Sequence, residues 1–202
     1  MNNSNDVGEV LADVVVGSKG WLHDEWMLSF YPEDIPKEWC LGFYANEFNT
    51  LLVGWEDWHN AIETLKEGLD DTADDFHLYL ELPEAHQALP VDLSDIKERV
   101  TGLVCAEPEK WQADADNLNI RLFQVLSENG EVFQRLESFP KVEAVEAILL
   151  NGANIDDLAM MRAQLELALK ITGTRLDCIF VDEVPDMEAM QNTRMIAELM
   201  GA

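Results

Sequence analysis

The chain has 202 residues, 48% of them hydrophobic, which is enough to bury one substantial core. Its 40 acidic and 13 basic residues give a formal charge of -27. Because such a charge repels phosphate groups, it argues against direct binding to nucleic acid or to an anionic membrane. It would instead attract cations or the basic surface of another protein.

The composition predicts a single cytoplasmic domain over residues 1–202, with a disordered tail over residues 1–10. The 11 glycines and 7 prolines are scattered, so nothing marks a linker. The polar start lacks the features of a secretory signal, and no apolar run reaches membrane-spanning length. No Cys-x-x-Cys pair occurs, and buried free thiols are expected at Cys40, Cys105 and Cys178.

Strands and helices alternate along the first half of the sequence. Short apolar runs predict strands at residues 14–16, 51–53, 76–82 and 103–106. Helical patterns lie between them at residues 36–48, 57–68 and 92–100. Pro36 suits a first helical turn, Gly68 suits a helix end, and Asp92 or Ser94 suits a helix start.

The second half contains two ambiguous segments. Residues 120–126 predict a strand, after which Glu128-Asn129-Gly130 predicts a hairpin turn into residues 132–136. The same turn residues could instead begin a helix, and we favour the hairpin. Residues 147–150 fit a strand or the end of a helix. A helix capped by Asn154 is expected at 155–171, then a strand at 176–181 and a closing helix at 187–200.

This alternation, repeated roughly seven times, predicts an α/β fold with a parallel sheet and crossover helices. The sheet could be open and doubly wound, or it could close into a barrel. A complete eightfold β/α barrel usually needs about 250 residues, so a barrel of this length would be trimmed.

Residues 17–32 read Gly-Ser-Lys-Gly-Trp-Leu-His-Asp-Glu-Trp-Met-Leu-Ser-Phe-Tyr-Pro. This motif resembles the opening of the YecE-like family, a group of mostly bacterial β/α barrels of unknown function. Residues 39–50 are similar to the family's first helix, and residues 75–83 to its third strand. Residues 176–181 and 188–194 resemble its closing strand and helix. The resemblance implies a trimmed or incomplete TIM-like β/α barrel with mainly parallel strands, shortened in the middle.

The chain also departs from the family pattern at positions that matter for function. Where the family has an acidic residue after its second strand, this chain has Leu52, and the following polar-aromatic stretch reads Trp-Glu-Asp-Trp over residues 55–58. A Glu-x-Arg group of the family would fall on Cys105 and Glu107. The resemblance therefore implies that an anion- or substrate-binding pair has been lost.

In a parallel barrel the functional residues lie at the carboxyl ends of the strands. Reading the sequence in this way gives the ligand-binding candidates Trp21, His23, Trp26, Trp55, Glu81, Glu107 and Asp182. The tryptophans could stack on a planar or sugar-like ligand, or they could simply plug a narrow barrel. His23 is the favoured histidine, although a structural role in its loop is the alternative. Other polar residues near these ends are Ser18, Lys19, Glu56, His86 and Glu183.

Neither a catalytic residue nor a cofactor can be assigned from the sequence. No zinc motif occurs, because no two histidines lie at helical spacing. Carboxylates with a histidine could still hold a divalent metal, but 40 acidic residues place some acids at strand ends by chance.

Three functional hypotheses remain. The first is a divergent binding protein with a degenerate barrel pocket and an acidic interaction surface for a basic partner protein. The second is an enzyme that acts on a small polar substrate through Trp21, His23, Glu81 and Asp182, with or without a metal. The third is an acidic mimic of nucleic acid that occupies a basic protein.

Overall fold

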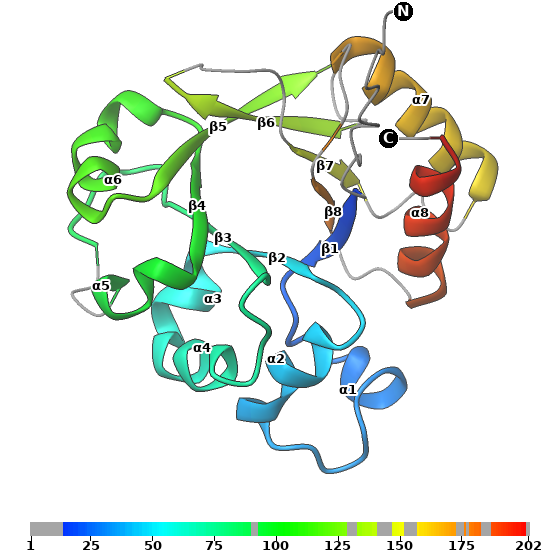
Figure 1. The fold of residues 1–202 in the computed structure, drawn as a ribbon, viewed down its shortest axis with the longest axis horizontal. Coiled ribbons are helices and arrows are strands. Elements are labelled where there is room, and N and C mark those ends of the chain that lie inside the picture. Colours follow the sequence, from blue (N-terminus) through cyan, green and yellow to red (C-terminus); the bar gives the residue numbers. More distant parts are fainter. Residues whose placement is uncertain are drawn as a thin grey trace, which may run out of the picture.

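The computed structural model describes residues 14–89, 93–128, 133–140, 147–151, 157–172, 176, 178–182 and 187–200, so the tail predicted at residues 1–10 lies outside it. Eight strands form a closed barrel in sequence order (Figure 1). The strands are β1 (Val15–Lys19), β2 (Thr50–Val53), β3 (His77–Glu81), β4 (Val100–Cys105), β5 (Arg121–Glu128), β6 (Phe133–Phe139), β7 (Ala147–Asn151) and β8 (Cys178–Asp182). Of the two predicted arrangements, an open sheet and a closed barrel, the structure shows the closed barrel. A closed barrel has no unpaired edge strand.

One strand runs against the others. β6 pairs antiparallel with both β5 and β7, whereas every other neighbouring pair is parallel. The predicted hairpin between β5 and β6 is therefore confirmed, and residues 147–150 belong to a strand. Antiparallel neighbours need only a short turn, while parallel ones need a crossover of a dozen or more residues. This reversal explains how a chain of 202 residues closes an eight-stranded barrel.

The described helices lie outside the ring of strands (Figure 1). They are α1 (Trp26–Ser29), α2 (Lys37–Ala45), α3 (Trp55–Asn60), α4 (Ile62–Leu69), α5 (Leu93–Ile96), α6 (Gln112–Leu118), α7 (Leu158–Thr172) and α8 (Met187–Met200), with 3-10 turns η1 (Lys97–Arg99) and η2 (Pro108–Lys110). The sequence prediction missed α1 and α6. It also joined α3 and α4 into one helix, which the structure divides at Ala61.

The start of α7 differs from the prediction. The carboxylate of Asp157 accepts hydrogen bonds from the backbone N–H groups of Ala159 (2.8 Å) and Met160 (3.2 Å). Asp157 is therefore the N-cap that satisfies the first free amides of the helix. The predicted cap, Asn154, lies outside the described residues.

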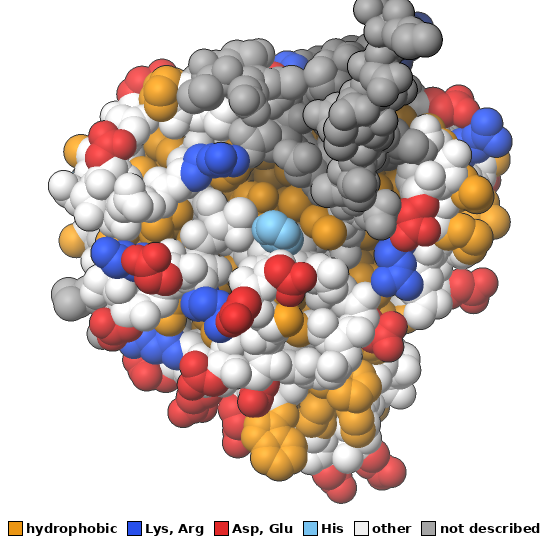
Figure 2. All heavy atoms as spheres, viewed as in Figure 1, with side chains coloured by type: hydrophobic (Ala, Val, Ile, Leu, Met, Phe, Trp, Pro, Cys, Tyr) orange, Lys and Arg blue, Asp and Glu red, His pale blue; other side chains and the backbone are white. Residues whose placement is uncertain are grey.

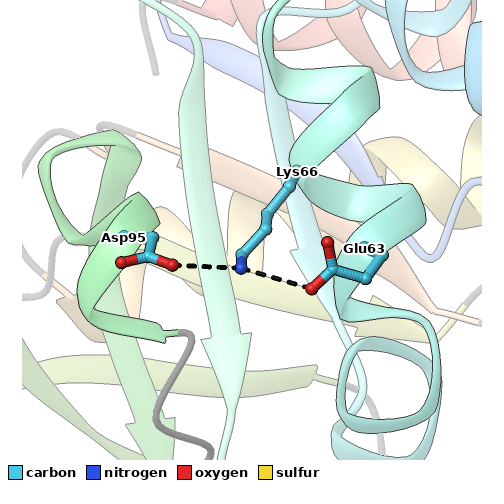
Figure 3. A network of polar contacts seen from close by, with 3 residues as sticks. All are labelled: Glu63, Lys66 and Asp95. Atoms are coloured by element: carbon cyan, nitrogen blue, oxygen red, sulfur yellow. Dashed lines mark hydrogen bonds and ion pairs between the residues drawn. The ribbon is translucent and has the colours of Figure 1, made fainter.

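An ion-pair network ties neighbouring helices together on the outside of the barrel (Figure 3). The ammonium group of Lys66 on α4 lies 3.3 Å from a carboxylate oxygen of Glu63 and 3.3 Å from one of Asp95 on α5. Both acidic side chains are largely exposed, so each pair contributes about 1 kcal/mol or less.

The apolar residues form two layers. The barrel interior is filled by Leu52, Tyr79, Val104, Phe123, Leu136, Ala147, Leu149, Cys178 and Phe180. A larger cluster packs between the outer face of the strands and the helices. All three cysteines are buried and free, as predicted. Because side chains occupy the centre of the barrel, a ligand site is expected at one of its ends.

None of the helices that the structure describes is long and apolar enough to cross a membrane.

Candidate functional site

Charged side chains converge at the carboxyl ends of the parallel strands β8, β1 and β3, of which β8 and β1 are direct neighbours while β2 lies between β1 and β3. Successive residues of a strand alternate between the two faces of a sheet. Glu81 follows the interior residue Tyr79 by two positions on β3, and Asp182 follows Phe180 likewise on β8. Both positions therefore face the barrel axis at its carboxyl end, which we call the mouth.

Lys19, at the end of β1, is paired within this mouth. Its ammonium nitrogen lies 2.9 Å from a carboxylate oxygen of Glu81, and 28% and 23% of the two side chains are exposed. Burial alone would lower the pKa of Lys19, but Glu81, Asp182 and Asp57 together raise it above its ordinary value. Lys19 is therefore a protonated ammonium group at neutral pH, neutralised by its carboxylate partner.

Asp57 lies beside this ion pair although it comes from the first turn of α3. A β-carbon on Gly54 would lie 3.3 Å from Asp57 Oδ2, 3.7 Å from Glu81 Oε2 and 3.9 Å from Lys19 Cε. The two carboxylates and the lysine stem thus surround one glycine. We refer to Lys19, Asp57, Glu81 and Asp182 as the mouth cluster.

A small cavity adjoins the mouth cluster and shares Asp57 with it. Its volume is about 160 Å³, and it is lined by Gly20, Trp21, Leu22, His23, Asp57 and Ala61. The side chain of Trp21 is only 2% exposed. Among the described residues, neither Trp21 Nε1 nor His23 Nε2 has a hydrogen-bond partner. The cavity is therefore lined by an indole, an imidazole and one carboxylate, and a buried nitrogen of each ring lacks a partner in the described part of the chain.

The turn after β1 shapes this cavity. Gly20 has a φ of 82°, a backbone conformation that residues with a side chain adopt at a cost. A β-carbon there would come within 3.0 Å of His23 Cε1 and 3.2 Å of His23 Nε2. Glycine at this position therefore permits both the sharp turn and the close packing of the imidazole.

Burial lowers the pKa of His23, and the backbone of Gly20 and Lys19 with the carboxylates of Asp57 and Glu25 opposes this shift only in part. His23 is therefore a neutral imidazole at pH 7. In that form one ring nitrogen donates a hydrogen bond and the other accepts one.

The lowered pKa of His23 predicts a loss of stability in mild acid. In the unfolded chain His23 takes up a proton near pH 6.5, whereas in the folded chain it does so only at a lower pH. The contribution of His23 to stability is thus fully present above about pH 6.5 and declines as the pH falls toward the folded pKa. An NMR titration of the His23 ring should give a pKa below 6.5. His23→Gln should flatten the fall in unfolding free energy between about pH 6.5 and 5. A His23 pKa at or above 6.5 would contradict this prediction.

The other tryptophans near the predicted strand ends are not among the residues that line the cavity, although Trp26 packs edge-on against His23 with ring centres 4.5 Å apart. Trp26 is 1% exposed, and its ring stacks on Tyr44 in the outer core. Trp58 is fully buried and donates a hydrogen bond from Nε1 to the backbone oxygen of Glu81 (2.8 Å), which anchors the end of β3. Trp55 stacks on His59 with ring centres 4.3 Å apart. Trp26 therefore packs in the outer core, and its role as a ligand contact stays a prediction.

The remaining polar candidates have partners elsewhere. Glu107 is largely exposed and forms an ion pair with Lys110. Ser18 is fully buried, and its backbone N–H donates to the hydroxyl of Tyr44 (2.9 Å). His86 pairs with Asp114 at 2.8 Å. The side chain of Glu56 is exposed, and Glu183 lies outside the described residues.

The structure thus brings together Trp21, His23, Glu81 and Asp182 from the predicted set, and it adds Asp57 and the pairing role of Lys19. Within the described part of the chain, no three His, Cys, Asp or Glu side chains are placed to hold one metal ion. Comparison of the sequence with protein-family models, curated proteins and solved structures finds no match. The resemblance to the YecE-like family therefore stays a prediction.

Proposed function

We propose that the chain is a binding protein that holds a small polar molecule in the cavity beside the barrel mouth. The observation that carries this proposal is a cavity lined by Trp21, His23 and Asp57, together with the lack of a hydrogen-bond partner for Trp21 Nε1 and His23 Nε2 among the described residues. Buried polar groups are nearly always hydrogen-bonded, and each unsatisfied one costs about 1–3 kcal/mol. A bound molecule toward which either ring turns would relieve that cost.

The lining side chains define the chemistry of this molecule. The indole of Trp21 can only donate a hydrogen bond, neutral His23 can donate or accept, and Asp57 accepts. The ligand must therefore present an acceptor to the indole and a donor or a positive charge to the carboxylate. Small amides, amino alcohols and amines meet this requirement.

Size and charge narrow the ligand class further. A cavity of about 160 Å³ has the volume of about five water molecules and is smaller than the pockets that bind drug-sized ligands. The formal charge of -27 disfavours an anion. We therefore expect a neutral or cationic metabolite with few heavy atoms.

Two features of the mouth support binding rather than catalysis. Lys19 is paired with Glu81, and its raised pKa keeps the amine protonated, so it lacks the free lone pair of a base or nucleophile. Leu52, where the resemblance implies an acidic residue, is fully buried in the barrel interior. These features, with the closed and mainly parallel barrel, support a trimmed TIM-like protein whose pocket has degenerated.

The enzyme hypothesis keeps one supporting observation, which is the neutral imidazole of His23 beside the carboxylate of Asp57 in the cavity. That pair could accept a proton from a bound substrate.

A ligand panel tests the proposal. Purified protein is screened by thermal shift and calorimetry against small amides, amino alcohols and amines, with carboxylic acids of matched size for comparison. A ligand that binds only the native state raises the melting temperature in a saturable way. We expect such a shift for an uncharged or cationic compound, and we expect His23→Gln and Asp57→Asn each to weaken its binding about tenfold, which corresponds to about 1.4 kcal/mol.

His59→Gln is the matched control, because His59 is exposed on α3 and lies outside the cavity lining. It should bind the ligand as the wild type does. A panel without any shift, or a ligand that His23→Gln binds equally well, would refute the binding site. Conversion of the bound compound, followed by NMR and lost in His23→Gln, would establish the enzyme hypothesis instead.

A further inference from the structure

A second concave surface shares no lining residue with the cavity beside the barrel mouth. The loop before α2 and the outer side of α2 form an open groove of about 580 Å³. Its apolar lining consists of Pro32, Ile35, Pro36, Trp39 and Phe43. We call this surface the α2 groove.

Helix α2 has apolar side chains on two sides. Cys40, Leu41 and Tyr44 are buried toward the barrel. Trp39 belongs to the other side, and 60% of its surface is exposed. An exposed tryptophan in an apolar groove is the kind of residue that dominates the binding energy of protein interfaces.

The groove is bordered by acidic residues. Glu33, Asp34 and Asp71 line it and are exposed, and the described residues of its lining include neither lysine nor arginine, although the exposed Lys37 follows Pro36. Asp70, next to Asp71, is exposed as well. Figure 2 shows hydrophobic side chains gathered over the lobe formed by α1 and α2, with acidic side chains at its border. The surface is therefore apolar in its centre and negative around it.

We infer that the α2 groove is a docking surface for a basic segment of another protein. An apolar side chain of that segment would fill the space between Ile35 and Phe43. A flanking arginine or lysine would lie over the exposed ring of Trp39, where a cation is attracted by the aromatic face. Further basic residues would pair with Glu33 and Asp71. This inference does not depend on the small-ligand cavity, which is lined by other residues.

Charge complementarity selects this occupant over others. An acidic or purely apolar segment would leave the carboxylates of the groove without counter-charges, and a chain with a net charge of -27 would repel a second copy of itself. A basic segment with one apolar anchor matches both the centre and the border of the groove.

Fluorescence anisotropy with three labelled peptides tests the inference on the full chain. The first peptide alternates arginine and leucine, the second replaces the leucines with glycine, and the third replaces the arginines with glutamate. We expect only the first to bind tightly, with an affinity that falls as salt increases, because salt screens exposed charges. Trp39→Ala should weaken this binding about tenfold or more, as expected for a central aromatic anchor.

Two pairs of charge variants distinguish attraction of the peptide by the acidic residues of the groove from attraction by the net negative charge of the whole protein. Glu33→Gln with Asp71→Asn removes two negative charges at the groove. Glu84→Gln with Glu109→Gln removes the same charge from exposed residues outside its lining. The first pair should weaken binding at least several-fold more than the second. Equal loss from both pairs, no effect of Trp39→Ala, or equal binding of the glycine peptide would each overturn the inference, as would failure of the arginine–leucine peptide to bind. Circular dichroism of each variant confirms that it is folded.

Discussion

Replacing Gly17 with alanine is expected to destabilise the protein more than any other single methyl group added to the barrel. A β-carbon at Gly17 would lie 2.0 Å from the backbone oxygen of Thr50 and 2.7 Å from its carbonyl carbon. The obstacle is the backbone of the paired strand β2, which cannot rotate away as a side chain can. Overpacking usually costs about 1–3 kcal/mol, and we expect Gly17→Ala to reach or exceed the upper end of that range.

Urea unfolding followed by circular dichroism measures this effect. Gly54→Ala is the matched control, because Gly54 has an ordinary extended conformation and its added methyl group would meet only side-chain atoms, at 3.3 Å or more. Gly54→Ala should cost about 1 kcal/mol or less, since flexible side chains can shift. Equal destabilisation by the two variants would show that the approach of β1 to β2 is not the limiting contact.

Tyr44→Phe is expected to produce the second large loss of stability. Tyr44 on α2 is fully buried, and its hydroxyl group lies between β1 and β2. It accepts a hydrogen bond from the backbone N–H of Ser18 (2.9 Å) and donates one to the backbone oxygen of Thr50 (2.9 Å). Phenylalanine would leave both backbone groups short of a partner. The combined cost should be about 2–4 kcal/mol, because each buried unsatisfied group costs about 1–3 kcal/mol.

Tyr31→Phe provides the comparison for this second variant. The hydroxyl of Tyr31 donates a single hydrogen bond, to the backbone oxygen of Trp21 (2.5 Å), and Tyr31 is also buried. Its removal leaves only one acceptor unpaired, so Tyr31→Phe should cost roughly half as much as Tyr44→Phe in the same urea titration. If the two variants lose equal stability, the two hydrogen bonds of the Tyr44 hydroxyl do not contribute more than the single one of Tyr31.

Much of the strand order could be predicted from the sequence, because strands in a filled barrel are short apolar runs. Residues 51–53 and 76–82 were recognisable in this way, and the glycine after β2 marked its end. Helix α6 was not recognisable, because its sequence Gln-Ala-Asp-Ala-Asp-Asn-Leu has almost no apolar face, and Ala115 is its only buried residue. The strand predicted at residues 14–16 was also too short, because β1 continues through Gly17 to Lys19.

The candidate site was predictable where a residue ends a strand or lies in the turn that follows it. Glu81 and Asp182 end β3 and β8, so their convergence follows from the alternation of strand side chains. Asp57 lies within the first turn of α3, and its approach to the same place depends on how that helix leaves β2. The local sequence also could not show that Trp21 lines the cavity while Trp26 does not. The direction of the chain after β1 depends on the positive φ of Gly20, which the sequence pattern does not reveal.

The pairing of β1 with β8 makes the mouth cluster depend on contacts between distant parts of the sequence. Lys19 belongs to the first strand of the barrel and Asp182 to the last, and the two strands become neighbours only when the ring closes. Contacts between residues so distant in the sequence form late, because the entropy of the intervening loop must be overcome first. A ribosome-bound chain that has not yet released β8 would therefore have β1 and its lysine without their final neighbour. Assembly of the mouth cluster therefore requires that β1 and β8 have paired.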